Sequence, residues 1–416
     1  MKRRNSYRNV TQKDPSLGRI LAVLTGIAAL AYGAFHVFHW ADENYFGGRA
    51  EASAHETVGE ARDLVMAGRY DEAREMLEPL VSRVSHAGVT PEALLLLAKV
   101  EKEAGNLDEA YAYLQRAAKD FPRSPHQPRA AVAYAGMLED RGEMDAAYAL
   151  YEEVRANAVP ELRAPAYTAF GRRAEREGDL FAARDYYEQA VKEAAWNSEE
   201  WNEALDALGE VNVELIFSRT ETPESKVYEV RSGDNLTAIG VQLNTTQGLL
   251  MRANGIDDPR NLRVGQRLKY TPKDFRIVIE RSTNRLFLLD NDGIFKRYYT
   301  GLGAPGSETT LGSYRIGNKQ KDPTWFKPGY GPIPPNHPDN ELATRWMPMV
   351  PEEEGLPTDL GIHGTIAPET IGTFASNGCA RMHTEEVEEL YDIVVRATPV
   401  DVVEEIEPGM FGLDLG

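Results

Sequence analysis

A pattern that repeats about every 37 residues constrains the first half of this chain more than any other feature. Four segments each begin with a glycine and carry an alanine five positions later, and successive glycines are 37, 37 and 36 residues apart: Gly68, Gly105, Gly142 and Gly178. Such a period is typical of stacked helix pairs, because one pair cannot bury its apolar face alone. Each glycine is expected to end a helix in the left-handed conformation, and each alanine to let the next helix pack closely. The sequence predicts an all-α solenoid over residues 51–217.

The pattern resembles tetratricopeptide repeats, with a slightly longer unit. The resemblance implies a scaffold whose concave face binds a protein partner that the sequence does not name. Four aromatic residues in this region either form a ligand surface or pack between helices, namely Tyr70, Tyr151, Tyr186 and Tyr187. We favour packing between helices, because they recur at helical spacing.

The only cysteine of the chain, Cys379, follows a histidine, His363, that lies in an apolar setting. An ordinary thiol has a pKa of roughly 8.5 and is mostly protonated at neutral pH, so a nucleophilic cysteine needs an imidazole to take its proton. We expect His363 to be that base, with a lowered thiol pKa, and a backbone carbonyl near Gly364 to fix the ring tautomer. Two alternatives stay open: an inert buried thiol, and His383 as the base.

The residues before the thiol, Ser376-Asn377-Gly378, predict a tight turn whose N–H groups could meet an oxyanion. The run from Ser376 to Met382, together with His363-Gly364-Thr365, resembles the catalytic signature of the L,D-transpeptidases, the YkuD-type enzymes that remodel bacterial peptidoglycan. Asn377 departs from the histidine that is common in the family, and Ala380 replaces a larger aliphatic residue.

The resemblance implies a mostly β catalytic domain over residues 274–403. It further implies that Cys379 attacks the third residue of a peptidoglycan stem peptide, releasing D-alanine, and that an amine then resolves the thioester. Arg381 is expected either to bind a substrate carboxylate or to form a structural ion pair, while Ser376, Asn377 and Gly378 support the loop. Neither a cofactor nor a metal is implied. A hydrolase with water as acceptor (L,D-carboxypeptidase or endopeptidase) and a non-catalytic wall-binding scaffold remain alternatives.

Period-two patterns predict the strands of this domain at 276–280, 285–289, 294–299 and 400–402, with a helix from Thr384. Residues 322–357 read as one long irregular stretch rich in proline and aromatic residues. It is expected either to cover the cleft, with Trp325 and Tyr330 shaping the donor site, or to be an ordered surface insert.

A smaller module precedes the catalytic domain, at residues 226–271. A strand at 227–230, two short helices and a returning strand at 262–268 are predicted, an order that resembles a βααβ LysM module. The resemblance implies binding of peptidoglycan glycan strands, with four candidate sugar contacts: Gly233, Asp234, Asn235 and Ile256. The alternative is that these residues only build the turn and the helix cap.

The N-terminus predicts export. Residues 1–19 are basic, and residues 20–40 are nearly uncharged and long enough to cross roughly 30 Å of hydrocarbon as a helix. We expect a single-pass anchor in the cytoplasmic (inner) membrane with the later domains in the periplasm or cell wall space; a cleaved signal peptide is the alternative. Acidic residues outnumber basic ones 65 to 46, so nucleic acid is not an expected partner. The acidic tail at 404–416 is expected to be loose.

Overall fold

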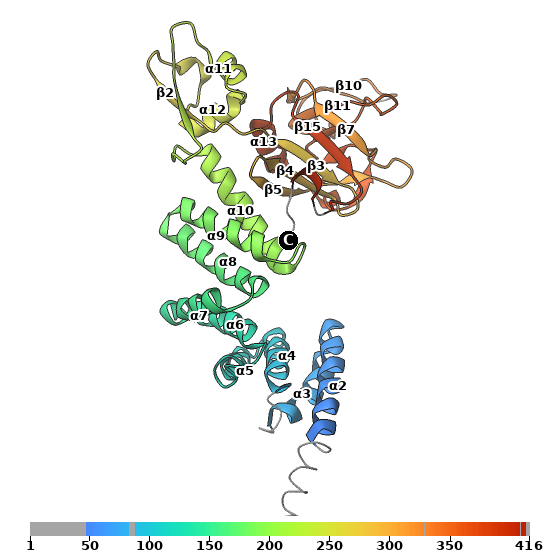
Figure 1. Ribbon diagram of the computed structural model, residues 1–416. Coiled ribbons are helices and arrows are strands. Elements are labelled where there is room, and N and C mark those ends of the chain that lie inside the picture. The colour runs from blue at the N-terminus through green and yellow to red at the C-terminus, as the bar shows by residue number, and fades with distance from the viewer. Residues whose placement is uncertain (1–46, 83–87, 328, 408, 413–416) are drawn as a thin grey trace, which may run out of the picture. The chain divides into compact units, whose positions relative to one another are not determined.

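The computed structural model describes residues 47–82, 88–327, 329–407 and 409–412 (Figure 1). The chain divides into two compact units between Ala147 and Tyr148. The basic segment and the anchor predicted at 1–19 and 20–40 lie outside the described residues. Among the helices that are described, none combines the length and the apolar character needed to cross a membrane.

The repeat region is helical throughout its described residues. Its helices are α2 (Gly47–Met66), α3 (Tyr70–Ser82), α4 (Thr90–Glu103), α5 (Leu107–Lys119), α6 (Gln127–Asp140), α7 (Met144–Asn157), α8 (Pro160–Glu177), α9 (Leu180–Glu193) and α10 (Glu199–Phe217). All four repeat glycines have φ between 73° and 81°, so each sits in the left-handed region directly before the next helix. The four repeat alanines, Ala73, Ala110, Ala147 and Ala183, are fully buried. Both parts of the helix-pair prediction are confirmed.

The tyrosines of the second unit pack between helices as expected. Tyr187 is fully buried, and its ring lies so close to α8 that a Cβ added at Gly171 would be 2.4 Å from it. Tyr186 stacks on Phe170, with ring centroids 5.5 Å apart. These aromatic residues therefore stabilise the helix pairs.

The small module has the predicted βααβ order. Its elements are β1 (Lys226–Glu229), α11 (Leu236–Gln242), α12 (Gln247–Asn254), the 3-10 turn η2 (Pro259–Asn261) and β2 (Arg267–Tyr270), with β1 and β2 antiparallel. The returning strand begins later than predicted, because Gly265 adopts a φ of 80° in a turn whose Gln266 N–H donates to Arg263. Lys269 projects from β2 to the C-terminal end of α10, where its Nζ donates to the carbonyls of Leu215 and Ser218 (2.7 and 2.8 Å).

The C-terminal domain is built on one mixed sheet of nine strands. In spatial order these are β14 (Ala380–Arg381), β12 (Gly361–His363), β11 (Arg345–Pro351), β7 (Gly312–Ile316), β15 (Pro399–Val403), β3 (Arg276–Glu280), β4 (Arg285–Asp290) and β5 (Gly293–Tyr299), with β8 (Gln320–Lys321) paired to β11. A two-stranded pair joins β6 (Leu302–Gly303) to β13 (Phe374–Ser376). The β12–β14 and β15–β3 pairs are parallel. The strands predicted at 276–280, 285–289, 294–299 and 400–402 are confirmed.

Strands β3 and β4 are buried on both faces. Ile277 and Leu286 belong to the core of the catalytic domain, whereas Val278 and Phe287 pack against Trp201 of α10 and other helical residues. Helix α10 also contributes Ile216 to the catalytic core, and Figure 1 shows it running from α9 toward the small module. The last repeat helix is therefore part of the catalytic core, whereas the sequence placed it in the solenoid alone.

Of two expectations for the end of the chain, one is confirmed and one is corrected. Helix α13 spans Thr384–Ile393, so it begins at the predicted Thr384. The tail is not loose at its start, because the Ile406 side chain is buried and its N–H donates to Glu280 (2.9 Å).

The stretch at 322–357 is more regular than its composition suggests. It contains the short antiparallel pair β9 (Trp325–Phe326) and β10 (Pro332–Ile333), followed by β11 in the main sheet.

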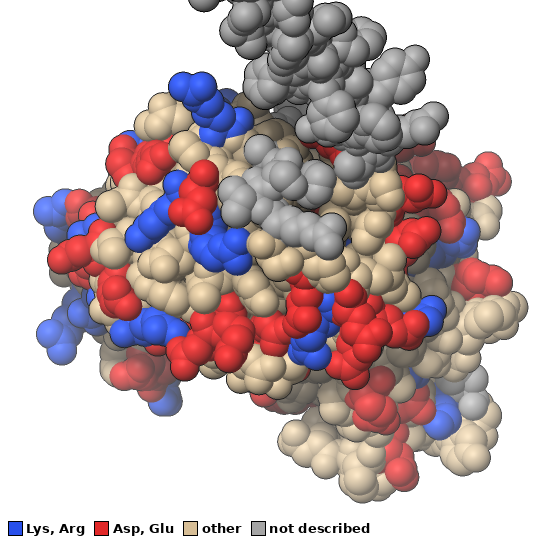
Figure 2. Space-filling model, turned by 90° about the horizontal axis from the view of Figure 1, so that it is seen from below, with Lys and Arg blue, Asp and Glu red and all other residues tan. Residues whose placement is uncertain are grey.

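On the surface shown in Figure 2, acidic side chains form a band with fewer basic ones between them, in keeping with the net charge of −19.

Candidate active site

The parallel pair β12–β14 brings the predicted base and nucleophile together. His363 is opposite Arg381 in the register, and Ile362 is opposite Ala380. Cys379 directly precedes β14, so continuing the ladder places it beside Gly361. Because side chains two positions apart on a strand share a face, the thiol and the imidazole emerge on one face of the ladder.

His363 is held in one tautomer by the peptide that follows it. Its Nδ1 lies 2.6 Å from the carbonyl oxygen of Gly364. A carbonyl oxygen only accepts, so Nδ1 carries the ring proton and Nε2 is left as an acceptor. The carbonyl expected near Gly364 is the one that contacts the ring.

The imidazole is neutral in the resting site. The side chain is buried, and Trp346 of the neighbouring strand packs against it with ring centroids 5.8 Å apart. Burial, with a smaller contribution from the charge of Arg381, lowers the pKa of His363 to about 4, although the Gly364 carbonyl opposes this shift. Gly361 allows the indole to approach, since a Cβ there would lie 2.4 Å from the Trp346 ring.

The expected lowering of the thiol pKa is wrong for this resting structure. Burial, together with the Asp359 carboxylate, raises the pKa of Cys379 to about 11, and the Gly361 backbone and Arg381 offset only part of the rise. The Sγ donates to the Asp359 carbonyl (3.8 Å), and within the described residues no hydrogen bond joins it to the imidazole. The resting pair is therefore a neutral thiol beside a neutral imidazole.

Hydrogen bonds of the Ser376 side chain stabilise the turn before Cys379. The buried Ser376 Oγ donates to the Cys379 carbonyl (2.7 Å) and accepts from the Gly378 N–H (3.1 Å). Gly378 has a φ of 111°, which only glycine adopts without strain. Because its N–H is occupied, Gly378 does not supply an oxyanion donor in this conformation. The other amides of the turn, those of Asn377 and Cys379, are the candidates for that role.

Arg381 forms the structural ion pair that was one of its two expected roles. Its Nη2 lies 3.1 Å from Glu341 Oε2, and 13% of its side chain is exposed. The Nε is buried and has no hydrogen-bond partner among the described residues.

The other predicted site residues are spread over a wider surface. Asn377 is exposed beside the thiol, Trp325 is half-buried in β9, and Tyr330 is 74% exposed in the β9–β10 connection. His383 stands at the start of α13 without a side-chain cap hydrogen bond. No sequence pattern pointed to Asn340 and Glu341, whose contacts near the site arise only in the folded chain.

The candidate sugar contacts of the small module also have structural roles within the module. Asp234 accepts from the Arg231 N–H (2.7 Å) and from the Tyr228 hydroxyl (2.9 Å), and Asn235 caps α11 by accepting from Ala238 N–H (2.9 Å). Gly233 is exposed in the left-handed region, and Ile256 packs partly against the core of the module.

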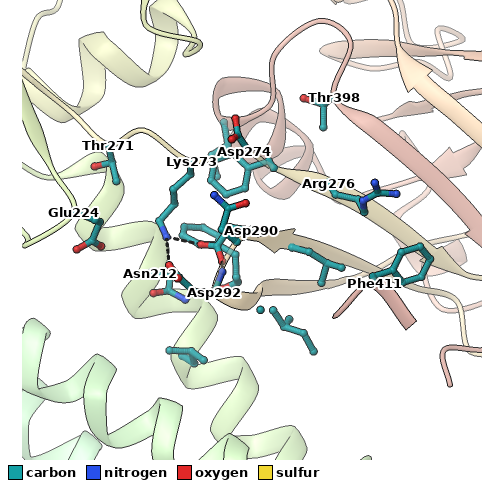
Figure 3. Close-up of a pocket in the computed structure, with 18 of the residues that line it drawn as sticks. Asn212, Glu224, Thr271, Lys273, Asp274, Arg276, Asp290, Asp292, Thr398 and Phe411 are labelled. Atoms are coloured by element: carbon teal, nitrogen blue, oxygen red, sulfur yellow. Dashed lines mark hydrogen bonds and ion pairs between the residues drawn. The ribbon is translucent and has the colours of Figure 1, made fainter. Parts of the chain in front are cut away.

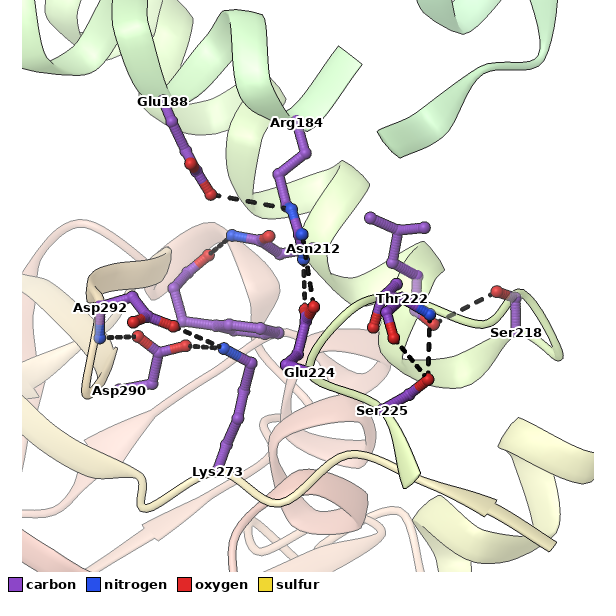
Figure 4. A network of polar contacts seen from close by, with 12 residues as sticks. Arg184, Glu188, Asn212, Ser218, Thr222, Glu224, Ser225, Lys273, Asp290 and Asp292 are labelled. Atoms are coloured by element: carbon purple, nitrogen blue, oxygen red, sulfur yellow. Dashed lines mark hydrogen bonds and ion pairs between the residues drawn. The ribbon is translucent and has the colours of Figure 1, made fainter. Parts of the chain in front are cut away.

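A cavity of about 1620 Å³ lies away from Cys379 and His363, among α9, α10, the small module and the β4–β5 end of the catalytic domain (Figure 3). Its charged side chains are largely paired. Arg184 pairs with Glu224 and Glu188, and Lys273 pairs with Asp290 and Asp292 (Figure 4). These pairs fasten the linkers on both sides of the small module. The candidate nucleophile and base lie together at Cys379 and His363, and not at this larger space. In the described part of the chain, no cluster of three or more His, Cys, Asp or Glu residues suits a metal ion.

Comparison with known proteins agrees with this geometry. Family models match the tetratricopeptide repeat over residues 58–125 and 95–159, the LysM domain over 228–271, and the L,D-transpeptidase catalytic domain over 274–402. YqjB of Bacillus subtilis, named as an L,D-transpeptidase, is 30% identical over 135 residues, which are 32% of this chain and 74% of YqjB. This chain belongs to the L,D-transpeptidase family.

The enzyme carries its tetratricopeptide repeats and LysM domain ahead of the L,D-transpeptidase domain. YkuD of Bacillus licheniformis, also named as an L,D-transpeptidase, is 28% identical over 182 residues, 42% of this chain and 98% of that protein. Similar solved structures include an L,D-transpeptidase from Mycobacterium tuberculosis (17% identity, 34% of this chain, 63% of that one, TM-score 0.27). Another is the catalytic domain of an Enterococcus faecium L,D-transpeptidase (23% identity, 31% and 97%, TM-score 0.26).

Proposed function

We propose that Cys379 is the nucleophile and His363 the general base of a two-step acyl transfer on peptidoglycan stem peptides. The observation that carries the proposal is the hydrogen bond from His363 Nδ1 to the Gly364 carbonyl (2.6 Å). It leaves Nε2 without the ring proton, and the ladder register places the imidazole and the thiol on one face. A neutral pair of this kind transfers the proton as the sulfur attacks, so a preformed thiolate is not required.

In the first step Nε2 takes the thiol proton, and sulfur bonds to the carbonyl carbon of the third stem-peptide residue. The C–N bond to D-alanine then breaks, and the imidazolium returns its proton to the leaving amine. In the second step an amine attacks the thioester and its proton passes to Nε2. The C–S bond breaks, and the sulfur regains a proton. Water in place of the amine would make the enzyme a carboxypeptidase or endopeptidase.

The remaining parts of the chain suit an enzyme held at the cell wall. The LysM domain is proposed to bind glycan strands through Gly233, Asp234, Asn235 and Ile256, and the repeats to bind a protein partner. Residues 20–40 are proposed to anchor the chain in the cytoplasmic membrane, with the later domains outside it. Protease added to intact spheroplasts would then remove those domains, and their survival would argue against this topology.

Product analysis tests the chemistry. The purified full-length enzyme is incubated with a disaccharide-tetrapeptide and a D-amino acid or a second stem peptide as acceptor, and the products are identified by mass spectrometry. We expect loss of D-alanine, an acyl adduct on Cys379, and an exchanged or cross-linked product. Cys379→Ala should abolish all three and still sediment with insoluble peptidoglycan. Turnover that survives this substitution would refute the assignment, and a tripeptide as sole product would assign a hydrolase.

A further inference from the structure

One short segment, Asn340–Ala343, lies between the β9–β10 pair and the catalytic dipeptide His363-Gly364. It packs directly on Gly364. A Cβ added to Gly364 would be 3.0 Å from the Ala343 Cβ and 3.5 Å from the Leu342 carbonyl oxygen. The segment therefore fixes the position of the peptide whose carbonyl orients the imidazole.

The first residue of the segment ties it to the β9–β10 pair. Asn340 is 1% exposed, and its Nδ2 lies within hydrogen-bond distance of the carbonyls of Pro323 (2.9 Å), Pro334 (3.1 Å) and Ile333 (3.4 Å). Its Oδ1 accepts from the Leu342 N–H (3.1 Å). Both the donor and the acceptor group of this buried amide form hydrogen bonds. A displacement of the β9–β10 strand pair would therefore also displace the segment Asn340–Ala343.

The second residue ties the segment to the catalytic ladder. Glu341 Oε2 lies 3.1 Å from Arg381 Nη2, and Oε1 lies 3.4 Å from Lys327 Nζ. Lys327 in turn lies over the rings of Trp325 and Tyr330, at 4.8 and 5.4 Å from their centroids. Arg381 is the direct register partner of His363. One carboxylate thus links the aromatic residues of the β9–β10 connection to the strand beside the base.

Backbone strain marks the last residue of the segment. Ala343 has a φ of 51°, a left-handed conformation that is strained for a non-glycine residue and persists only where the surroundings impose it. Its Cβ is the atom nearest to the position of a Gly364 side chain. The strained residue therefore presents the atom nearest to the position that a Gly364 side chain would take.

We propose that Asn340–Ala343 is a positioning element for His363, in which Glu341 acts through Arg381 and Ala343 acts through Gly364, so that substrate held at the β9–β10 connection sets the alignment of the base. The proposal rests on the proposed role of His363. In this role Arg381 positions His363 whether or not it also contacts the substrate.

Steady-state kinetics of the full-length enzyme on the disaccharide-tetrapeptide test the proposal. Glu341→Gln keeps the shape and removes the charge, and it should lower kcat about tenfold with KM nearly unchanged, since it weakens an interaction expressed in the transition state. Glu341→Asp should recover part of the loss. Glu352→Gln is the matched control, because Glu352 pairs with Arg315 on the surface at 3.7 Å, both side chains being about half exposed.

A second variant separates positioning from folding. Ala343→Gly relieves the left-handed strain, so its Tm should be equal or higher, while kcat falls because the contact with Gly364 is lost. If Glu341→Gln behaves like Glu352→Gln, or raises KM with kcat unchanged, the positioning role is overturned, and the second result assigns Glu341 and Arg381 to substrate binding. Should the unsubstituted enzyme show no Cys379-dependent transfer, the proposed function fails instead.

Discussion

The ring Nδ1 of His363 donates its proton to the carbonyl oxygen of the very next residue, Gly364, over 2.6 Å. Many catalytic histidines depend on a carboxylate for this orientation, as in the Ser-His-Asp triad. Here a neutral carbonyl performs it, and no carboxylate among the residues that the structure describes is bonded to the ring to stabilise its protonated form. The low pKa of the base and the high pKa of the thiol both follow mainly from desolvation, which the nearby Arg381 offsets only in part for the thiol.

The first prediction concerns alkylation of Cys379. Because burial raises the thiol pKa to about 11, iodoacetamide near pH 7 should modify the folded enzyme at least about tenfold more slowly than the urea-unfolded chain, and the rate should climb with pH beyond 9. Mass spectrometry follows the adduct, and Cys379→Ser supplies the blank. Rapid modification of the folded enzyme below pH 8 would mean that the thiolate is stabilised after all.

The second prediction concerns acid stability. The pKa of His363 is about 4 in the folded protein, against an ordinary value of 6.5. The unfolded chain therefore binds more protons between these values, and stability is lost as the pH falls from 6.5 through 4. The loss reaches about 3 kcal/mol at lower pH, from about 1.4 kcal/mol per pKa unit. Denaturant melts of His363→Gln should lack this part of the decline. His337→Gln, at an exposed histidine, should retain it, and equal pH profiles for all three proteins would contradict the prediction.

The third prediction concerns the turn before the thiol. Ser376→Ala removes the hydroxyl that holds the Cys379 carbonyl and the Gly378 N–H, and it leaves a buried donor unpaired. The loss should cost about 1–3 kcal/mol of unfolding free energy and lower the rate of Cys379 acylation. Thr373→Ala removes an exposed hydroxyl that donates to Thr370 and should change neither quantity. A Ser376→Ala enzyme with unaltered stability and acylation would exclude this role for Ser376.

The fourth prediction concerns the docking of α10 on the catalytic domain. A Cβ at Gly209 would lie 2.8 Å from Lys296 Cγ and 3.3 Å from its Cα, so Gly209→Ala should destabilise the catalytic domain by about 1–3 kcal/mol. Gly59→Ala, in helix α2 with no atom within 4 Å of the added group, should instead stabilise its helix by up to about 1 kcal/mol. Calorimetry of the Gly209→Ala and Gly59→Ala variants measures whether stability falls in the first and rises in the second. Equal effects would mean that α10 is not held against β5.

Much of the architecture could be predicted because it depends on local, periodic features. The repeat glycines end helices because of their own backbone freedom, and the short apolar runs of β3 and β4 mark strands without reference to distant partners. The loop residues at 322–357 were harder to interpret, since β9, β10 and β11 are defined by pairing partners and not by their own pattern.

The sequence by itself determined the order of the domains and the identity of the candidate nucleophile and base, because these rest on residue types and short spacings. Only the tertiary structure decided that α10 belongs to the catalytic core, that Ile406 is buried, and that Glu341 contacts Arg381. It also reversed the expected direction of the thiol pKa. Spacing indicates which groups can meet, whereas a pKa depends on how much water and charge surround a group, and that environment is created only when distant segments pack together.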